Sequence, residues 1–140
     1  MNDKRSPAIG DPALRVDGHA KATGAQIYPS DYVLDGMLFV RVFRSALPHA
    51  RILNIDPRAA EKTPGVVRVI TAADIPGEKN AGLFIPDQPV LCDEVVRRQG
   101  DAIALVVAET DEAVRQACEL IKVDFEPLPL VTDMLSAADS

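Results

Sequence analysis

Tryptophan is absent from this sequence, aromatic residues make up 4% of it, and only two cysteines and two histidines occur among 140 residues. No C-x-x-C or H-x-x-x-H spacing is present, so no familiar set of zinc or iron–sulfur ligands can be named. Phosphate-binding motifs of the G-x-G-x-x-G and P-loop types are missing, as is the G-x-S-x-G nucleophile elbow. We therefore assign no catalytic, cofactor-binding or metal-ligating residue from the sequence.

The sequence also lacks an excess of positive charge. Lys and Arg number 15 against 21 Asp and Glu, which gives a net charge of −6. A nucleic-acid partner is not expected, because such proteins need a basic face to displace counterions. No apolar run approaches the ~20 residues of a membrane span, and the N-terminus MNDKRSPAIGD has no apolar leader. We expect a cytoplasmic protein without a membrane partner.

The few candidate reactive side chains have simple structural interpretations. Cys118 falls on an apolar helical stripe and is predicted to be a buried, inert thiol, whereas the Pro-flanked loop around Cys92 leaves its exposure open. His49 stands beside a strand end, where a hydrogen-bonding turn residue is expected. The many carboxylates are predicted to be solvated faces, helix caps and strand-end charges, because spacing alone identifies no general-acid pair.

The length suits one domain, and its core must be built mostly from Val, Ile, Leu and Ala. Residues 1–36 are rich in Gly, Pro and charge and are predicted to form an extended arm, which Ile27, Tyr28 and Tyr32 could pin to another surface. The folded domain is predicted over residues 37–135, with a tail at 136–140.

Alternation and β-branched runs predict strands over residues 38–43, 51–56 and 66–71. Pro57 suits the first position of a short helix, with Asp56 as its N-cap. After the third strand, residues 72–75 allow one helical turn, which Pro76 and Gly77 end. Residues 77–93 are then predicted to form a long loop.

A short strand and a turn at Gly100 precede the apolar run 102–109, which is typical of a strand buried on both faces beside a parallel neighbour. Thr110 or Asp111 caps the helix that follows, and residue 122 begins a last strand. This order predicts a C-terminal, right-handed βαβ unit in a mixed sheet with one to three helices, an α+β fold. The apolar stripe of the helix comprises Ala113, Val114, Ala117, Cys118 and Ile121.

Five motifs in order give a resemblance to a known family. They are a Gly-to-Asp motif from Gly24 to Asp31, S-x-x-x-H-A-x-I at 45–52, P-G-V followed by T-A-x-D-I-P-G at 64–77, G-D-x-I-A-x-V-V-A at 100–108, and E-P-L-P at 126–129. Over about residues 17–138 the chain resembles the N-terminal α/β-hammerhead domain of the molybdenum-binding large subunit in the xanthine dehydrogenase, aldehyde oxidase and carbon monoxide dehydrogenase family.

The resemblance implies a domain of an oxidoreductase that hydroxylates carbon centres with water, using a molybdenum–pterin cofactor and passing electrons to iron–sulfur and flavin (FAD) centres. The family's cofactor-binding and catalytic residues lie in domains that follow this one, so none is transferred to this chain. The isolated domain is then expected to be an inactive scaffold and interface. The substrate of the parent enzyme is not readable from these residues.

Two partner hypotheses follow from the resemblance. The loop around Phe84, Ile85 and Pro86 is expected to contact a molybdopterin-binding domain of the parent chain, and arm residues 17–36 are expected to lie against the iron–sulfur subunit or domain. Two alternatives stay open: an independent small protein- or ligand-binding module with the same fold, and a small enzyme whose site the motifs do not reveal.

Overall fold

The computed structural model describes residues 15–82 and 84–138. Residues 1–14 of the predicted arm and residues 139–140 of the predicted tail lie outside this range. The chain divides into two compact units, Met1–Asp35 and Gly36–Ser140.

Short local turns make up the described part of the first unit. A helix α1 (Gly18–Ala22) and a 3-10 turn η1 (Pro29–Asp31) are its two elements, and none of residues 15–35 is buried. The carboxylate of Asp17 pairs with Lys21 and accepts a 2.7 Å hydrogen bond from Arg15 Nε. Asp31 Oδ2 accepts a 2.8 Å bond from the backbone N–H of Tyr28. These contacts fix turns without forming a core.

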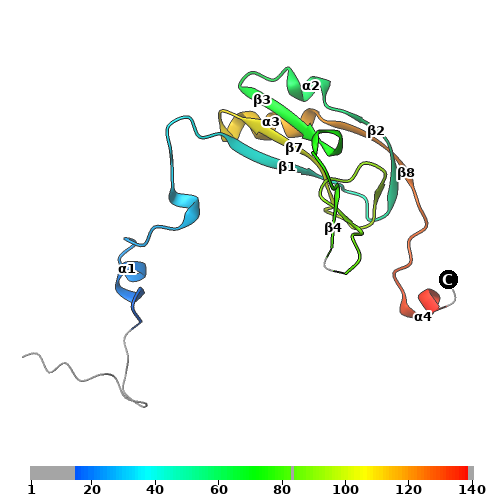
Figure 1. Cartoon of the computed structure of the whole chain (residues 1–140), viewed down its shortest axis with the longest axis horizontal. Helices are drawn as coiled ribbons and strands as arrows, with labels where there is room; N and C mark the ends of the chain where they lie inside the picture. The colour runs from blue at the N-terminus through cyan, green and yellow to red at the C-terminus, as the bar shows by residue number, and fades with distance from the viewer. Residues whose placement is uncertain (1–14, 83, 139–140) are drawn as a thin grey trace, which may run out of the picture. The chain divides into compact units, whose positions relative to one another are not determined.

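The second unit is built on a three-stranded sheet in the order β1–β7–β3 (Figure 1). Strand β1 covers Phe39–Arg44, β7 covers Ala102–Ala108 and β3 covers Val66–Thr71. Both neighbours of β7 are antiparallel to it, so the parallel neighbour predicted from its apolar run is wrong. The run is apolar because β7 is the central strand and side chains on both of its faces are buried.

A second sheet has the order β6–β2–β8. It contains β6 (Val95–Val96), β2 (Ala50–Asp56) and β8 (Lys122–Pro127), and β8 pairs antiparallel with β2. The predicted βαβ unit is therefore corrected. Helix α3 (Asp111–Leu120) follows β7 and leads to β8 in the other sheet, so the two strands do not form one parallel pair. Only Val123 and Phe125 of β8 are half-buried, which suits an edge strand with one covered face.

Smaller elements complete this unit. Helix α2 (Arg58–Glu61) follows β2, the 3-10 turn η2 (Ala72–Asp74) follows β3, and helix α4 (Met134–Ala138) is the last described element. The predicted loop 77–93 contains a third small sheet, in which β4 (Asn80–Ala81) pairs with β5 (Gln88–Pro89). The α+β class holds, with antiparallel pairing in all three sheets.

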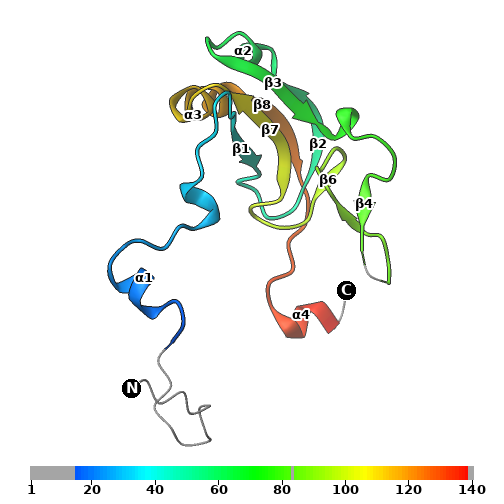
Figure 2. The ribbon, with the colours of Figure 1, turned by 60° about the vertical axis from the view of Figure 1, so that its left-hand side comes forward.

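Two apolar clusters meet at the β7 strand. In one of them, Ala104, Val106 and Ala108 pack with the buried stripe of α3, which runs over β1 and β7 (Figure 2). In the other cluster, Ile103 packs with Ala50, Ile52, Cys92 and Val96. Of the two predicted N-caps of α3, Thr110 is the one observed, since Thr110 Oγ1 accepts a 3.1 Å hydrogen bond from Ala113 N.

Truncating the β7 side chain at the centre of the second cluster should destabilise the fold. Ile103 is 0% exposed, so Ile103→Ala leaves a cavity and should lower the free energy of unfolding by about 2–5 kcal/mol. The matched control is Leu53→Ala, because Leu53 is 62% exposed and its truncation should change stability by less than about 0.5 kcal/mol. Urea denaturation measures both, and equal losses would contradict this account of the core.

Candidate functional site

The corner that ends β3 is held by one carboxylate. Asp74 Oδ2 accepts hydrogen bonds from the backbone N–H of Thr71 at 2.9 Å and from its hydroxyl at 3.3 Å, and Asp74 Oδ1 accepts one from Arg68 Nη2 at 2.6 Å. The Thr71 N–H first, and then the Arg68 guanidinium, lower the pKa of Asp74. Both oxygens are occupied in fixing the turn, so this corner is structural.

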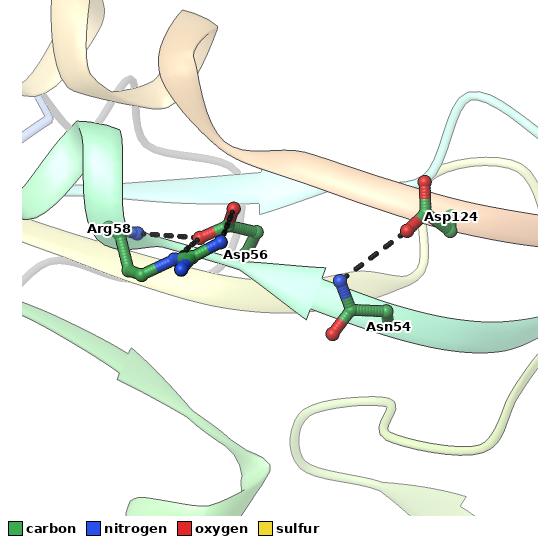
Figure 3. A network of polar contacts seen from close by, with 4 residues as sticks. All are labelled: Asn54, Asp56, Arg58 and Asp124. Carbon is green, nitrogen blue, oxygen red and sulfur yellow. Dashed lines mark hydrogen bonds and ion pairs between the residues drawn. The ribbon is translucent and has the colours of Figure 1, made fainter.

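A similar arrangement joins β2 to α2 (Figure 3). Asp56 accepts two bonds from the Arg58 guanidinium, at 2.8 and 2.7 Å, and a third from the Arg58 backbone N–H at 3.1 Å. These bonds lower the pKa of Asp56 and raise that of Arg58. The predicted N-cap is corrected by one residue: Pro57 occupies that position and α2 begins at Arg58, yet Asp56 still accepts a backbone N–H of the first turn.

His49 joins β2 to the segment that leaves β8. Its Nδ1 lies 2.7 Å from the carbonyl oxygen of Pro129, to which it donates, and the backbone N–H of Leu128 donates to the His49 carbonyl at 3.1 Å. The prediction of a hydrogen-bonding turn residue is confirmed. The long-range partner, 80 residues away, is what sequence reasoning missed.

The two cysteines differ from the sequence expectation. Cys92, whose exposure was left open, is 3% exposed in the second cluster, while Cys118, predicted to be buried, is only half-buried. Burial raises the pKa of both thiols, more than the nearby arginines lower it. Both therefore stay protonated near neutral pH, which is the opposite of an activated nucleophile.

The hairpin formed by β4 and β5 exposes apolar side chains at its tip. Phe84 is 92% exposed and Ile85 is 70% exposed, so neither belongs to the domain's own core. The tip is tight: a Cβ at Gly82 would lie 1.9 Å from the carbonyl oxygen of Ile85. At its base, Val90 N donates to Lys79 O at 2.9 Å, which anchors the returning strand.

The described side chains do not form a donor set for molybdenum or a pterin. Among residues 15–82 and 84–138, no three His, Cys, Asp or Glu side chains gather as metal ligands. A polar pocket beside the hairpin is lined by both lysine and carboxylate side chains, including Lys79, Asp87 and Asp93. No reaction step can be assigned to these residues.

No helix in the described part of the chain has both the length and the apolar character needed to span a membrane.

The Asp56–Arg58 contact should make stability depend on pH. Because folding lowers the pKa of Asp56, its contribution is fully present above the unfolded value of about 3.9 and is lost as pH falls through the lower folded pKa. Asp56→Asn should therefore reduce the free energy of unfolding at pH 7, and the difference from wild type should shrink below about pH 4.

The matched control for this comparison is Asp124→Asn, on the neighbouring strand (Figure 3). Asp124 accepts a single, long bond of 3.4 Å from Asn54 Nδ2. Urea titrations at pH 7 and pH 3 should show a smaller effect for this variant. An Asp56→Asn difference that stays constant over this pH range would contradict the role assigned to the ionised carboxylate.

Comparison with known proteins identifies relatives for most of the chain. It is 48% identical over 118 residues to a probable xanthine dehydrogenase subunit of Bacillus subtilis, an alignment that covers 84% of this chain and 16% of that protein. It is 38% identical over 131 residues to the nicotinate dehydrogenase large molybdopterin subunit of Eubacterium barkeri, covering 94% and 31%. The chain thus spans less than a third of the length of either relative.

The fold agrees with solved structures. Carbon monoxide dehydrogenase from Oligotropha carboxidovorans superposes with a TM-score of 0.84 at 39% identity, over 91% of this chain and 16% of that one. The aldehyde oxidoreductase of Desulfovibrio gigas gives 0.77 at 37% identity, over 82% and 14%. Residues 23–129 match the family described as aldehyde oxidase and xanthine dehydrogenase, a/b hammerhead domain. The resemblance found in the five motifs is therefore confirmed, and the chain belongs to this hammerhead-domain family.

Proposed function

We propose that this chain is a non-catalytic scaffold and interface domain of a molybdenum hydroxylase of the xanthine dehydrogenase and aldehyde oxidase type. Relatives of the chain include large, molybdopterin- or molybdenum-binding subunits, of which it spans a small part. The molybdopterin-binding domains would follow it, and iron–sulfur and FAD centres would lie in other domains or subunits. Both cysteines are free thiols, which favours the reducing cytoplasm.

Local use of charge supports a structural role. Asp56 and Asp74, whose pKa values are lowered, are each engaged by an arginine within six residues and by a backbone N–H. Perturbed carboxylates in an active site would instead converge on a shared cleft. A bound pterin, bound molybdenum or substrate turnover by this polypeptide alone would contradict the proposal.

The exposed hairpin tip is the observation that carries the interface role. Phe84 is 92% exposed and Ile85 is 70% exposed. Adjacent apolar side chains at this exposure are favourable when another surface covers them and removes them from water. The tip stands on a hairpin whose base is closed by backbone hydrogen bonds. We assign it to a contact with a molybdopterin-binding domain of the large subunit.

The described part of the first unit is assigned to a different partner. Ile27, Tyr28, Tyr32, Val33 and Leu34 are all exposed, by 48–82%. Residues 15–35 contain no buried residue to hold these side chains in a core. We assign residues 17–36 to the surface of the iron–sulfur subunit or domain.

Replacing the hairpin tip should weaken assembly without unfolding the domain. In the full-length large subunit, Phe84→Ser with Ile85→Ser should lower the yield of assembled, cofactor-loaded enzyme, because the apolar contact is lost. The same pair in the 140-residue chain should leave its urea midpoint unchanged, since both side chains are exposed. Leu53→Ser, at another exposed apolar position, is the matched control and should assemble normally. Equal yields for both variants would remove the hairpin from the interface.

Hydrogen exchange should separate the two units. In the chain alone, amides of residues 17–36 should exchange rapidly, whereas β7 amides should be protected. Adding the iron–sulfur subunit to the large subunit should slow exchange in residues 17–36 and leave β7 unchanged. Strong protection of residues 17–36 in the chain alone would instead show that this segment packs within the chain and needs no partner.

A further inference from the structure

Strand β1 is an open edge of the first sheet. It pairs with β7 on one side only, from Phe39↔Ala108 to Arg44↔Ala102. Outside that ladder, no hydrogen bond of the described residues engages the backbone of residues 39–44. A bulge interrupts the register between Phe43 and Arg44, which leaves Phe39 to Phe43 as a regular edge. Such an edge can accept a further strand.

The side chains of β1 differ from those of a protected edge. The β8 edge of the second sheet places charged Lys122, Asp124 and Glu126 outward and ends at Pro127. On β1, by contrast, Phe39 is 40% exposed and Val40 is 59% exposed. Charge, proline and bulges are the usual means of preventing edge pairing, and apolar exposure favours it. Of these two edge strands, one from each sheet, β1 is the better suited to a partner strand.

The cations on β1 lack anions. Six described arginines form ion pairs with carboxylates: Arg15, Arg51, Arg58, Arg68, Arg98 and Arg115. Neither Arg41 nor Arg44 does so, although the chain has six more acidic than basic residues. Arg44 donates to the carbonyl of Gly100 at 2.8 Å. Arg41 makes no hydrogen bond or ion pair within the described residues, so its guanidinium is available to an external carboxylate.

A groove beside the β1 edge adds an apolar subsite. It lies between β1 and α3 and is lined by the apolar side chains of Phe43 and Cys118 and by the charged side chains of Arg41, Arg115 and Glu119. Phe39, Arg41 and Phe43 stand opposite Ala108, Val106 and Ala104, which pack under α3, so all three face the groove side of the sheet. Val40 and Val42 face the other side, beside Val107 and Leu105.

We propose that the β1 edge binds an extended protein segment as a fourth strand, with an acidic residue opposite Arg41 and apolar residues on either side of it. The acidic side chain would pair with the free guanidinium. The apolar residues opposite Phe43 and Phe39 would enter the groove side, and those opposite Val42 and Val40 would extend the other face. Backbone hydrogen bonds supply affinity in this mode, and the alternate side chains supply selectivity.

A second copy of the chain is a poorer occupant. Symmetric antiparallel pairing of two regular β1 edges, residues 39–43, would place Arg41 opposite its own counterpart, and like charges across a strand pair are destabilising. Charge complementarity therefore selects an acidic strand from elsewhere. This inference concerns the edge alone and does not require the hairpin contact proposed above.

The test uses the 140-residue chain and two capped heptapeptides of alternating Val and Thr, one with a central Glu and one with a central Lys. The Glu peptide should bind about three- to tenfold more tightly, from the difference between an attractive and a repulsive cross-strand pair. Amide shifts in the NMR spectrum should map to residues 39–43. Arg41→Glu should reverse the preference, while Arg97→Glu, an equal charge change at another exposed arginine without an ion pair, should keep it.

Several outcomes would overturn the proposal. They are equal binding of the two peptides, shifts that map away from β1, or an unchanged preference in the Arg41→Glu chain. Concentration-dependent dimerisation that Arg41→Glu abolishes would replace the acidic segment by a second copy. Unchanged β7 amide protection in each variant shows that loss of binding is not loss of fold.

Discussion

The fold depends on β7, because this strand is hydrogen-bonded on both edges and buried by different clusters on its two faces. Ala104, Val106 and Ala108 lie under α3, while Ile103 belongs to the cluster that includes β2 and β6. Both three-stranded sheets are thereby tied to one segment of seven residues. With no tryptophan and few aromatics, packing density must come from small and β-branched side chains, which leave little room for adjustment. A rigid centre of this kind can hold its strand ends in fixed positions.

At the ends of two strands, charged side chains fix the direction in which the backbone turns. Asp56 and Asp74 each close a turn at the end of a strand by accepting a backbone N–H. Each also accepts a hydrogen bond from an arginine: Arg58 follows Asp56 by two residues, and Arg68 precedes Asp74 by six. Because the contacts are local, they form as soon as the chain turns and cost little loop entropy. Their effect is to fix where α2 and the segment after η2 begin. His49 does the same for the chain after β8, but over a long sequence distance.

The sequence was sufficient for the main strands and for helix α3, but it did not reveal the short elements α1, β4, β5 and α4 or the pairing of the strands. Strand β3 matches its prediction at both ends, and β1 and β2 are displaced by a residue or less at each end, because alternation and Pro–Gly signals are local. Pairing was misjudged at β7, since a strand buried on both faces has the same apolar pattern whether its neighbours are parallel or antiparallel. The burial of Cys92 was also unreadable: it depends on a hydrogen bond from Cys92 N to Ala102 O, which fastens the loop over the core. The exposure of Phe84 and Ile85 agrees with the expectation that apolar residues in a loop have no local partner, whereas the β4–β5 pairing beside them was not predicted.

The proposed contact roles of the hairpin tip and the β1 edge would explain why a domain with a buried apolar core also exposes apolar side chains. A domain of this size buries roughly two-thirds of its unfolded surface and has no energetic reason to expose Phe84 or Val40. Val40 lies on the hydrogen-bonded β1 edge, whereas Phe84 lies in the loop between β4 and β5, which two residue pairs close at its base. Pre-ordered apolar groups lose little conformational entropy when they are covered, which lowers the cost of association. In the roles proposed above, the rigidity of β7 would serve the exposed periphery: a centre that does not deform would hold the hairpin tip and the β1 edge ready for neighbouring surfaces.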